Sequence, residues 1–172
     1  MPITIREAKN ARADRDWIEE IYGEYLADLT ADTTGVFPSL TITGQSVGEI
    51  IQGWFHDDRQ TTFVILRDND PTGFAVVQRM LAAPDDRKRH YRLSEFFIRR
   101  PFRRKGVGRS AAILLFARYA GEWTIAEQSR NVDATRFWRR VVGEFTNNKF
   151  SEKRGQNEIA HSFTSAGPVA SR

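Results

Sequence analysis

Residues 93–109 of the chain read LSEFFIRRPFRRKGVGR and are followed directly by SAAILLFARYA at residues 110–120. The first part is an apolar segment that ends at Ile98, and the last part is an apolar run with helical spacing. A tight basic turn with the pattern R-x-x-G-x-G separates them at residues 103–108. This order predicts a strand, a glycine-rich turn and a helix that begins at or near Gly108.

The predicted turn is suited to binding a diphosphate. Glycines let the backbone approach phosphate oxygens closely, and main-chain N–H groups at a helix N-terminus point toward such an anion. Cationic side chains surround the same position, namely Arg103, Arg104, Lys105 and Arg109. The turn therefore predicts a ligand that contains a nucleotide. An ordinary basic turn that begins a helix is the alternative.

Two other phosphate-binding patterns fit this turn poorly. The dinucleotide-binding pattern G-x-G-x-x-G needs a third glycine, and Ala111 occupies that position. Glu122 and Glu127 lie where that pattern expects an acidic residue, but about a hundred residues precede the turn. The pattern G-x-x-x-x-G-K-[ST] is absent from the sequence.

A second motif follows at residues 131–138, which read NVDATRFW. The two motifs together resemble the GCN5-related N-acetyltransferase (GNAT) superfamily. In that superfamily R/Q-x-x-G-x-G/A holds the pyrophosphate of acetyl-CoA, and N-x-x-A-x-x-[FL]-[YW] opens a later helix. The spacing between the motifs leaves room for one helix at residues 110–120 and one strand at residues 123–128. An ordinary helix cap is the alternative role for Asn131.

The remaining pattern predicts alternating strands and helices. Strands are expected at residues 3–8, 61–67, 74–80, 91–99, 123–128, 149–154 and 158–164. Helices are expected after a cap at Asp14 or Asp16, after a capping box of Ser46 with Glu49, and at residues 110–120 and 134–145. Residues 68–73 are expected to form a turn.

The order β-α-α-β-β-β-α-β-α-β-β resembles the GNAT superfamily over almost the whole chain. The resemblance implies an α/β fold with a mixed, mostly antiparallel central sheet and helices on both faces. It also implies acetyl-CoA as co-substrate, without a metal.

The resemblance assigns the residues that would bind acetyl-CoA. The central strand is expected to splay from its neighbour, so that the backbone of Phe96, Phe97 and Ile98 pairs with the pantetheine arm. The main-chain N–H of Phe97 or Ile98 would then polarise the acetyl carbonyl. The other expected contacts are Arg103, Arg104, Lys105, Gly106, Val107, Gly108, Arg109, Asn131, Ala134 and Phe137.

Glu95 is the expected general base. It is the only carboxylate in the apolar part of its strand, and many members of the superfamily carry an acidic residue there. Partial burial raises the pKa of a carboxyl group, which suits a base that works near neutral pH. A structural salt bridge to a nearby arginine is the alternative.

The general acid departs from the pattern of the superfamily. Many members carry a Tyr where this chain has Trp138, and an indole N–H cannot serve as a proton donor in catalysis. Three alternatives remain for the CoA thiolate. It leaves without a general acid, it takes a proton from solvent, or a tyrosine donates the proton, namely Tyr22, Tyr25, Tyr91 or Tyr119.

The expected activity is transfer of an acetyl group to a primary amine of a small molecule or peptide, within a ternary complex. A non-catalytic acyl-CoA sensor on the same fold is one alternative. A nucleic-acid-associated protein, suggested by the Lys and Arg cluster of residues 85–109, is another and less favoured alternative. The resemblance also implies an acceptor groove at residues 30–45, with Phe37, Trp54, Phe55, His56 and Asp57 as candidate linings.

Composition sets further limits. A length of 172 residues with 40% hydrophobic residues predicts one domain at residues 1–165, with a flexible tail at residues 166–172. The chain has no cysteine, and its three histidines are scattered, so a metal site is not expected. Because no apolar run approaches a membrane span, a cytoplasmic protein without membrane attachment is expected. The resemblance also implies a possible homodimer through the C-terminal strands.

Overall fold

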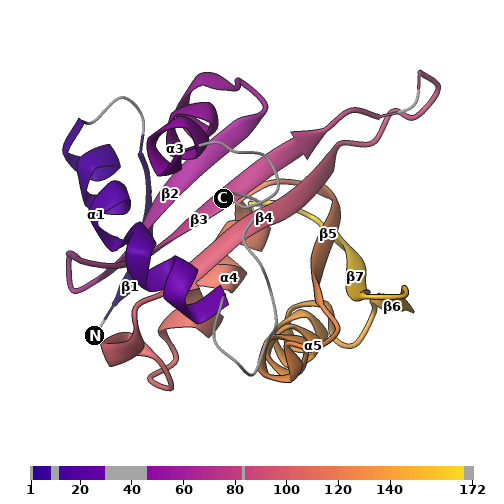
Figure 1. The fold of residues 1–172 in the computed structure, drawn as a ribbon. Helices are drawn as coiled ribbons and strands as arrows, with labels where there is room; N and C mark the ends of the chain where they lie inside the picture. Colours follow the sequence, from indigo (N-terminus) through magenta and orange to yellow (C-terminus); the bar gives the residue numbers. More distant parts are fainter. Residues whose placement is uncertain (1, 9–11, 30–45, 83, 169–172) are drawn as a thin grey trace.

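A single seven-stranded sheet forms the centre of the protein. The computed structural model describes residues 2–8, 12–29, 46–82 and 84–168. The strands lie in the order β1 (Ile3–Glu7), β2 (Gln60–Arg67), β3 (Asp70–Met80), β4 (His90–Ile98), β5 (Gly121–Gln128), β7 (Glu158–Ser165) and β6 (Ser151–Arg154) (Figure 1). Only β4 and β5 pair in parallel, and all other neighbours are antiparallel. The expected mixed, mostly antiparallel sheet is confirmed.

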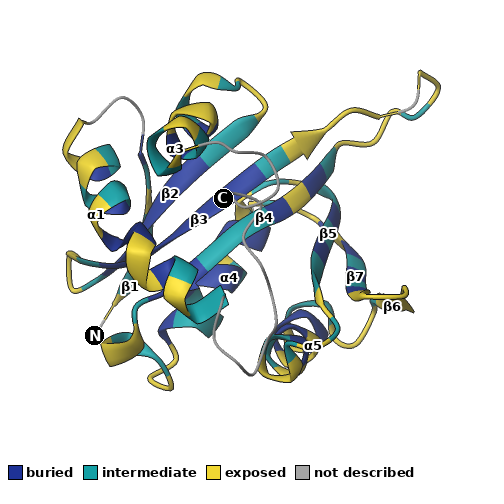
Figure 2. Ribbon diagram, viewed as in Figure 1, coloured by how far each residue is buried: buried dark blue, intermediate teal, exposed yellow. Residues whose placement is uncertain are grey.

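Helices cover both faces of this sheet, as expected. They are α1 (Arg12–Leu29), α3 (Val47–His56), α4 (Val107–Arg118) and α5 (Val132–Thr146), with a 3-10 turn at Arg100–Phe102 between β4 and α4. Because side chains alternate along a strand, β2 and β3 supply both cores. Val64 and Phe74 pack under α1 and α3, whereas Phe63 and Ala75 pack under α4 and α5. Figure 2 shows the buried residues along the central strands and on the helix sides that face them.

The connection between β2 and β3 is shorter than expected. It consists of Asp68 and Asn69, whose φ angles are 52° and 74°, and β3 already begins at Asp70. Asp and Asn tolerate this left-handed conformation, and two such residues match the twist of a tight hairpin. The predicted turn is therefore present, but it is limited to Asp68 and Asn69, and its predicted extent to residue 73 is wrong. Gly73 lies within β3, where a Cβ atom would meet the carbonyl oxygen of Phe97 at 2.1 Å.

The two predicted helix caps have different outcomes. Helix α1 is already helical at Arg12, so Asp14 and Asp16 lie inside it and the prediction that one of them caps it is wrong. The Asp14 carboxylate instead accepts a hydrogen bond from Arg6 at 2.6 Å. The capping box of α3 is confirmed. Ser46 Oγ accepts from the Glu49 N–H at 3.3 Å, and the Glu49 carboxylate accepts from the Ser46 N–H at 2.6 Å.

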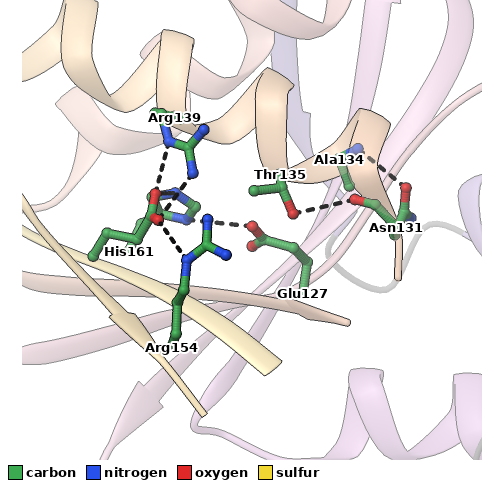
Figure 3. Close-up of polar contacts among 8 residues, drawn as sticks. Glu127, Asn131, Ala134, Thr135, Arg139, Arg154 and His161 are labelled. Atoms are coloured by element: carbon green, nitrogen blue, oxygen red, sulfur yellow. Dashed lines mark hydrogen bonds and ion pairs between the residues drawn. The ribbon is translucent and has the colours of Figure 1, made fainter. Parts of the chain in front are cut away.

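A cluster of ionisable side chains around the buried His161 lies between α5 and the β5–β7–β6 end of the sheet (Figure 3). His161 is fully buried, with Nδ1 at 3.5 Å from a Glu127 oxygen and Nε2 at 3.2 Å from a Glu152 oxygen. Arg139 of α5 donates to Glu152 at 2.8 Å and 2.9 Å and lowers the pKa of that carboxyl to about 2. Both Glu127 oxygens are buried without a hydrogen bond among the described residues. His161 therefore joins two carboxylates beneath α5.

Replacing His161 with alanine is expected to destabilise the fold by about 3 kcal/mol, because Glu127 would keep its burial and lose its neighbouring imidazole. Denaturant unfolding at neutral pH measures this loss. The double variant His161→Ala with Glu127→Gln is expected to recover part of it. A double variant no more stable than His161→Ala would show that the loss comes from the cavity alone.

Candidate active site

A β-bulge in β4 decides which way Glu95 points. Val77 pairs with Leu93, but Val76 pairs with Glu95, so Ser94 is an extra residue in β4. An extra residue reverses the alternation of side chains beyond it. Glu95 consequently shares the α1 and α3 face with Arg92, whereas Leu93 packs in the core on the other side. The Ser94 hydroxyl at the bulge is buried and has no hydrogen-bond partner among the described residues.

The partner of Glu95 is a tyrosine of α1. The Tyr25 hydroxyl donates a hydrogen bond to the Glu95 carboxylate, and Glu95 makes no ion pair within the described residues. Burial raises the pKa of Glu95, while the Tyr25 hydrogen bond and the charge of Arg92 act in the opposite direction. The salt-bridge alternative is therefore not what the structure shows. Glu95 is a half-buried carboxylate held by a phenol.

The four tyrosines considered as proton donors occupy different places. Burial is the main cause that raises the pKa of Tyr22 to about 12 and that of Tyr25 well above its usual range, and the charge of Glu95 adds to both shifts. Tyr91 and Tyr119 stack with their ring centres 5.0 Å apart under α4. Only Tyr25 contacts Glu95.

Strands β4 and β5 separate beside Glu95 (Figure 1). Their parallel pairing ends where Leu93 faces Ile125, so the rest of β4 is paired only with β3. The Arg99 N–H donates to the Thr72 carbonyl at 2.9 Å. Hydrogen-bonded and non-hydrogen-bonded pairs alternate in an antiparallel ladder, so the backbone groups of residues 96 and 98 point away from β3 into the opening, and those of residue 97 point toward β3.

The basic turn leads from this opening to an uncapped helix. Gly106 is the N-cap residue of α4 with a φ of 80°, and α4 begins at Val107, next to Gly108, so the predicted start is confirmed. No side chain caps this end, whereas Ser46 caps α3 and Asn131 caps α5. The first bond within the helix runs from the Ser110 N–H to the Gly106 carbonyl at 3.0 Å. The N–H groups of residues 107–109 are therefore oriented to receive an anion.

Arg103 fixes the turn in place. Its Nε donates to the Ile98 carbonyl at 2.6 Å, and its terminal nitrogen donates to Asp28 of α1. The guanidinium also lies over the Phe97 ring, 5.4 Å from the ring centre. This side chain joins β4, the turn and α1.

The other cations of the turn are paired to different degrees. Arg109 forms a two-bond ion pair with Glu144 of α5, with one of the bonds at 2.7 Å. Lys105 donates to the Pro101 carbonyl at 2.8 Å, and Arg104 lies 3.7 Å from Asp133 with both side chains exposed. Arg104 and Lys105 are thus the cations free to reach a ligand at the surface.

The second motif lies against the same end of the opening. The Asn131 side chain accepts a hydrogen bond from the Ala134 N–H at 3.1 Å, so its role as a helix cap is confirmed (Figure 3). The Phe137 ring stacks on Phe96 with ring centres 6.1 Å apart, and a Cβ on Gly108 would lie 3.4 Å from Phe137. The motif therefore contacts both β4 and the start of α4.

Trp138 packs in the core rather than facing solvent. Its side chain is buried, and its ring centre lies 5.0 Å from that of Phe96.

Most of the residues expected to line the acceptor groove are engaged in contacts with other parts of the protein. Trp54 is buried in the α1 and α3 core, Phe55 packs against that core, and Asp57 binds Arg59. Residues 30–45, including Phe37, lie outside the described residues. His56 is exposed at the end of α3.

A pocket of about 310 Å³ lies elsewhere on the Glu95 face, over β4 and β5. Sequence reasoning missed this pocket because its lining comes from four strands and the β3–β4 hairpin. Its residues include Met80, Leu81, Arg92, Thr124, Ala126 and Glu158.

Within the part of the chain that the structure describes, no cluster of three or more His, Cys, Asp or Glu side chains could hold a metal ion. None of the described helices is long and apolar enough to cross a membrane.

Comparison with known proteins agrees with this geometry. The model of the acetyltransferase (GNAT) family matches residues 18–143, and the chain belongs to this family. Members of the family transfer acyl groups and use acetyl-CoA. No curated protein matches the chain.

Solved structures share the fold at low sequence identity. A GNAT-family acetyltransferase from Streptococcus agalactiae has a TM-score of 0.70 and 14% identity, with 95% of each chain covered. An acetyltransferase from Thermus thermophilus has a TM-score of 0.62 and 19% identity, covering 94% of this chain and 97% of that one. A GNAT-family acetyltransferase from Staphylococcus aureus has a TM-score of 0.61 and 12% identity, covering 95% and 99%. These similarities establish the GNAT fold.

Proposed function

We propose that residues 1–165 form one acetyl-CoA-dependent N-acetyltransferase domain, which moves an acetyl group to a primary amine by direct transfer in a ternary complex. The amine belongs to a small molecule or a peptide. The observation that carries this proposal is the position of Glu95, beside a strand edge that opens toward an uncapped helix N-terminus.

The residues present fit acetyl-CoA, whose thioester supplies the activated acetyl group. The free N–H groups of residues 107–109 match a diphosphate, and Arg104 and Lys105 add positive charge beside it. The outward backbone groups of Phe96 and the outward N–H of Ile98 suit the amides of a pantetheine arm, whereas the Ile98 carbonyl already accepts a hydrogen bond from Arg103. We assign polarisation of the acetyl carbonyl to the Ile98 N–H rather than to Phe97, because the Phe97 amide faces β3.

Glu95 acts as the general base. An amine attacks a thioester only after losing its proton, and a carboxylate with a raised pKa accepts that proton directly or through a water molecule. The Tyr25 hydrogen bond holds the carboxylate in one orientation. The pKa of Tyr25 is raised well above its usual range, so this phenol stays protonated and remains a donor.

No side chain is assigned as general acid. Trp138 cannot donate a proton, Tyr25 is engaged with Glu95, and Tyr91 and Tyr119 stack under α4. We propose that the leaving thiolate takes its proton from solvent.

A non-catalytic acyl-CoA sensor is the second candidate, and Trp138 in place of a Tyr favours it. Nucleic-acid binding is less well supported, because much of the basic cluster is neutralised by acids from other elements. The pairs are Lys88–Glu122, Arg99–Glu24, Arg100–Asp28, Arg103–Asp28 and Arg109–Glu144.

Calorimetric titration with acetyl-CoA, followed by an assay of CoA release against a panel of amines, tests the proposal. Binding with amine-dependent release is the expected result. Binding without release for any amine would favour the sensor, and absence of binding would contradict both candidates.

A further inference from the structure

The pocket over β4 and β5 lies on the same face of the sheet as Glu95. Arg92 pairs with Gln78 and Glu95 pairs with Val76, and these two partners stand two residues apart on β3. Alternate residues of a strand share a face and lie about 7 Å apart along it. Thr124 of β5 faces Arg92 in the parallel ladder, so it continues this face next to the opening. Arg92 is also the cation whose charge reaches the Glu95 carboxyl.

Arg92 is the cation of the pocket that is free to bind a ligand. The structure gives it no ion pair or hydrogen bond through its side chain within the described residues, unlike most of the neighbouring arginines. The other charged residues of the pocket are either already paired or lie at its edge. Asp86 is held by His90 at 2.6 Å and by the Lys88 N–H at 2.8 Å, and Glu158 lies at the start of β7. A planar guanidinium with unused donors is suited to a carboxylate.

The wall of the pocket opposite β5 is apolar and exposed. Met80 is 40% exposed and Leu81 is 81% exposed, and both line the pocket where the β3–β4 hairpin leaves the sheet. Large apolar side chains at such exposure are suited to contact with an apolar ligand. The volume of about 310 Å³ is at the small end of ligand pockets and suits a molecule of amino-acid size.

From these features we infer that the acceptor is an apolar amino acid, whose carboxylate binds Arg92 while its amine faces Glu95. The side chain of this amino acid packs on Met80 and Leu81. The spacing of Arg92 and Glu95 along β4 suits an ammonium and a carboxylate that are attached to the same carbon atom. This inference rests on the proposed N-acetyltransferase function and names its acceptor class.

The test compares each amino acid with the amine that lacks its carboxylate. Leucine is compared with isoamylamine and phenylalanine with phenethylamine, using kcat/KM for CoA release. The wild-type protein is expected to prefer the amino acid of each pair. Arg92→Gln is expected to lower this preference about 10- to 100-fold, the range for a lost hydrogen bond to a charged group.

Arg79→Gln is the matched control. Arg79 is an exposed arginine of β3 on the opposite face of the sheet, so its replacement removes the same charge without touching the pocket. This control is expected to leave the preference unchanged. Arg92→Gln also removes a charge that affects Glu95, but this change acts on both members of a pair, and the ratio of their kcat/KM values cancels it.

Three outcomes would overturn the inference. They are equal kcat/KM for both members of every pair in the wild-type protein, an unchanged preference in Arg92→Gln, and a higher kcat/KM for a diamine than for any amino acid. In each of these cases turnover of the carboxylate-free amines would leave the N-acetyltransferase function standing. Binding of acetyl-CoA without turnover of any amine would instead contradict the proposed function itself.

Discussion

Replacing Gly106 with aspartate is expected to weaken acetyl-CoA binding by about 100-fold or more. An added carboxylate at the N-cap of α4 would lie within a few ångströms of the proposed diphosphate, where repulsion between like charges is about 3–4 kcal/mol at an intermediate dielectric. The same side chain would also bond to the N–H groups that the diphosphate needs. Calorimetric titration of acetyl-CoA measures the loss.

The fold of this variant is expected to stay intact. Among the described residues nothing lies within 4 Å of a Cβ atom on Gly106, and Asp is one of the few non-glycine residues that adopt a positive φ, although a φ of 80° strains any side chain. Because the left-handed backbone at this position is unfavourable for a residue with a side chain, the thermal midpoint is expected to fall slightly, at a cost of about 1 kcal/mol, without loss of cooperative unfolding.

Gly106→Asn separates the two causes of the loss. Asparagine caps the helix equally well but carries no charge, so its loss of affinity is expected to be smaller. If Gly106→Asp bound acetyl-CoA as well as the wild-type protein does, the diphosphate would have to lie elsewhere.

Replacing Glu95 with glutamine is expected to lower kcat by 10²- to 10⁴-fold, the usual contribution of a general base. Affinity for acetyl-CoA should be unchanged, because Glu95 faces α1 on the side of the sheet away from Phe137. The wild-type rate is expected to fall as the pH drops through the raised pKa of Glu95, and this limb should disappear in the variant. Full acetylation by Glu95→Gln at every pH would exclude Glu95 as the base.

The same variant is expected to be at least as stable as the wild-type protein at neutral pH. Since burial raises the folded-state pKa of Glu95, its contribution to stability is present below the unfolded-state pKa and is lost as the pH rises through the folded-state value. Glutamine removes this loss and still accepts the Tyr25 hydrogen bond. The thermal midpoints of the variant and the wild-type protein should therefore be equal at pH 4 and differ at pH 8.

Tyr25→Phe is the companion variant for the pH profile. The Tyr25 hydrogen bond lowers the pKa of Glu95, so its removal is expected to move the acid limb to higher pH. The rate on the plateau should change much less than in Glu95→Gln. An unmoved limb would show that another group controls it.

The fold and the turn could be predicted from local patterns. The glycines of the turn, the Asn131 motif and the Ser46 capping box each depend on residues within one or two turns of chain. Such signals survive in a single sequence because the contacts that they describe are short in range.

The detailed site could not be predicted, because it depends on contacts distant in the sequence. Tyr25 and Glu95 are 70 residues apart, and no pattern near either residue indicates the other. The bulge at Ser94 lacks the glycine that often marks such a position, so the side of the sheet on which Glu95 lies could not be predicted. The pairing of Arg103 with Asp28 of α1 was hidden for the same reason.

The sheet separates the proposed amine site from the proposed acetyl-CoA site, and the two meet only where β4 and β5 separate. Glu95 and Arg92 stand on one face, and the Phe96–Phe137 contact and the start of α4 belong to the other. If the proposed function is right, acetyl-CoA and the amine would enter from opposite faces of the sheet. Neither would block the binding or release of the other. Mutations on one face could then change which amine is accepted while the acetyl-CoA site on the other face stays unchanged. The same fold could in this way evolve to use different acceptors.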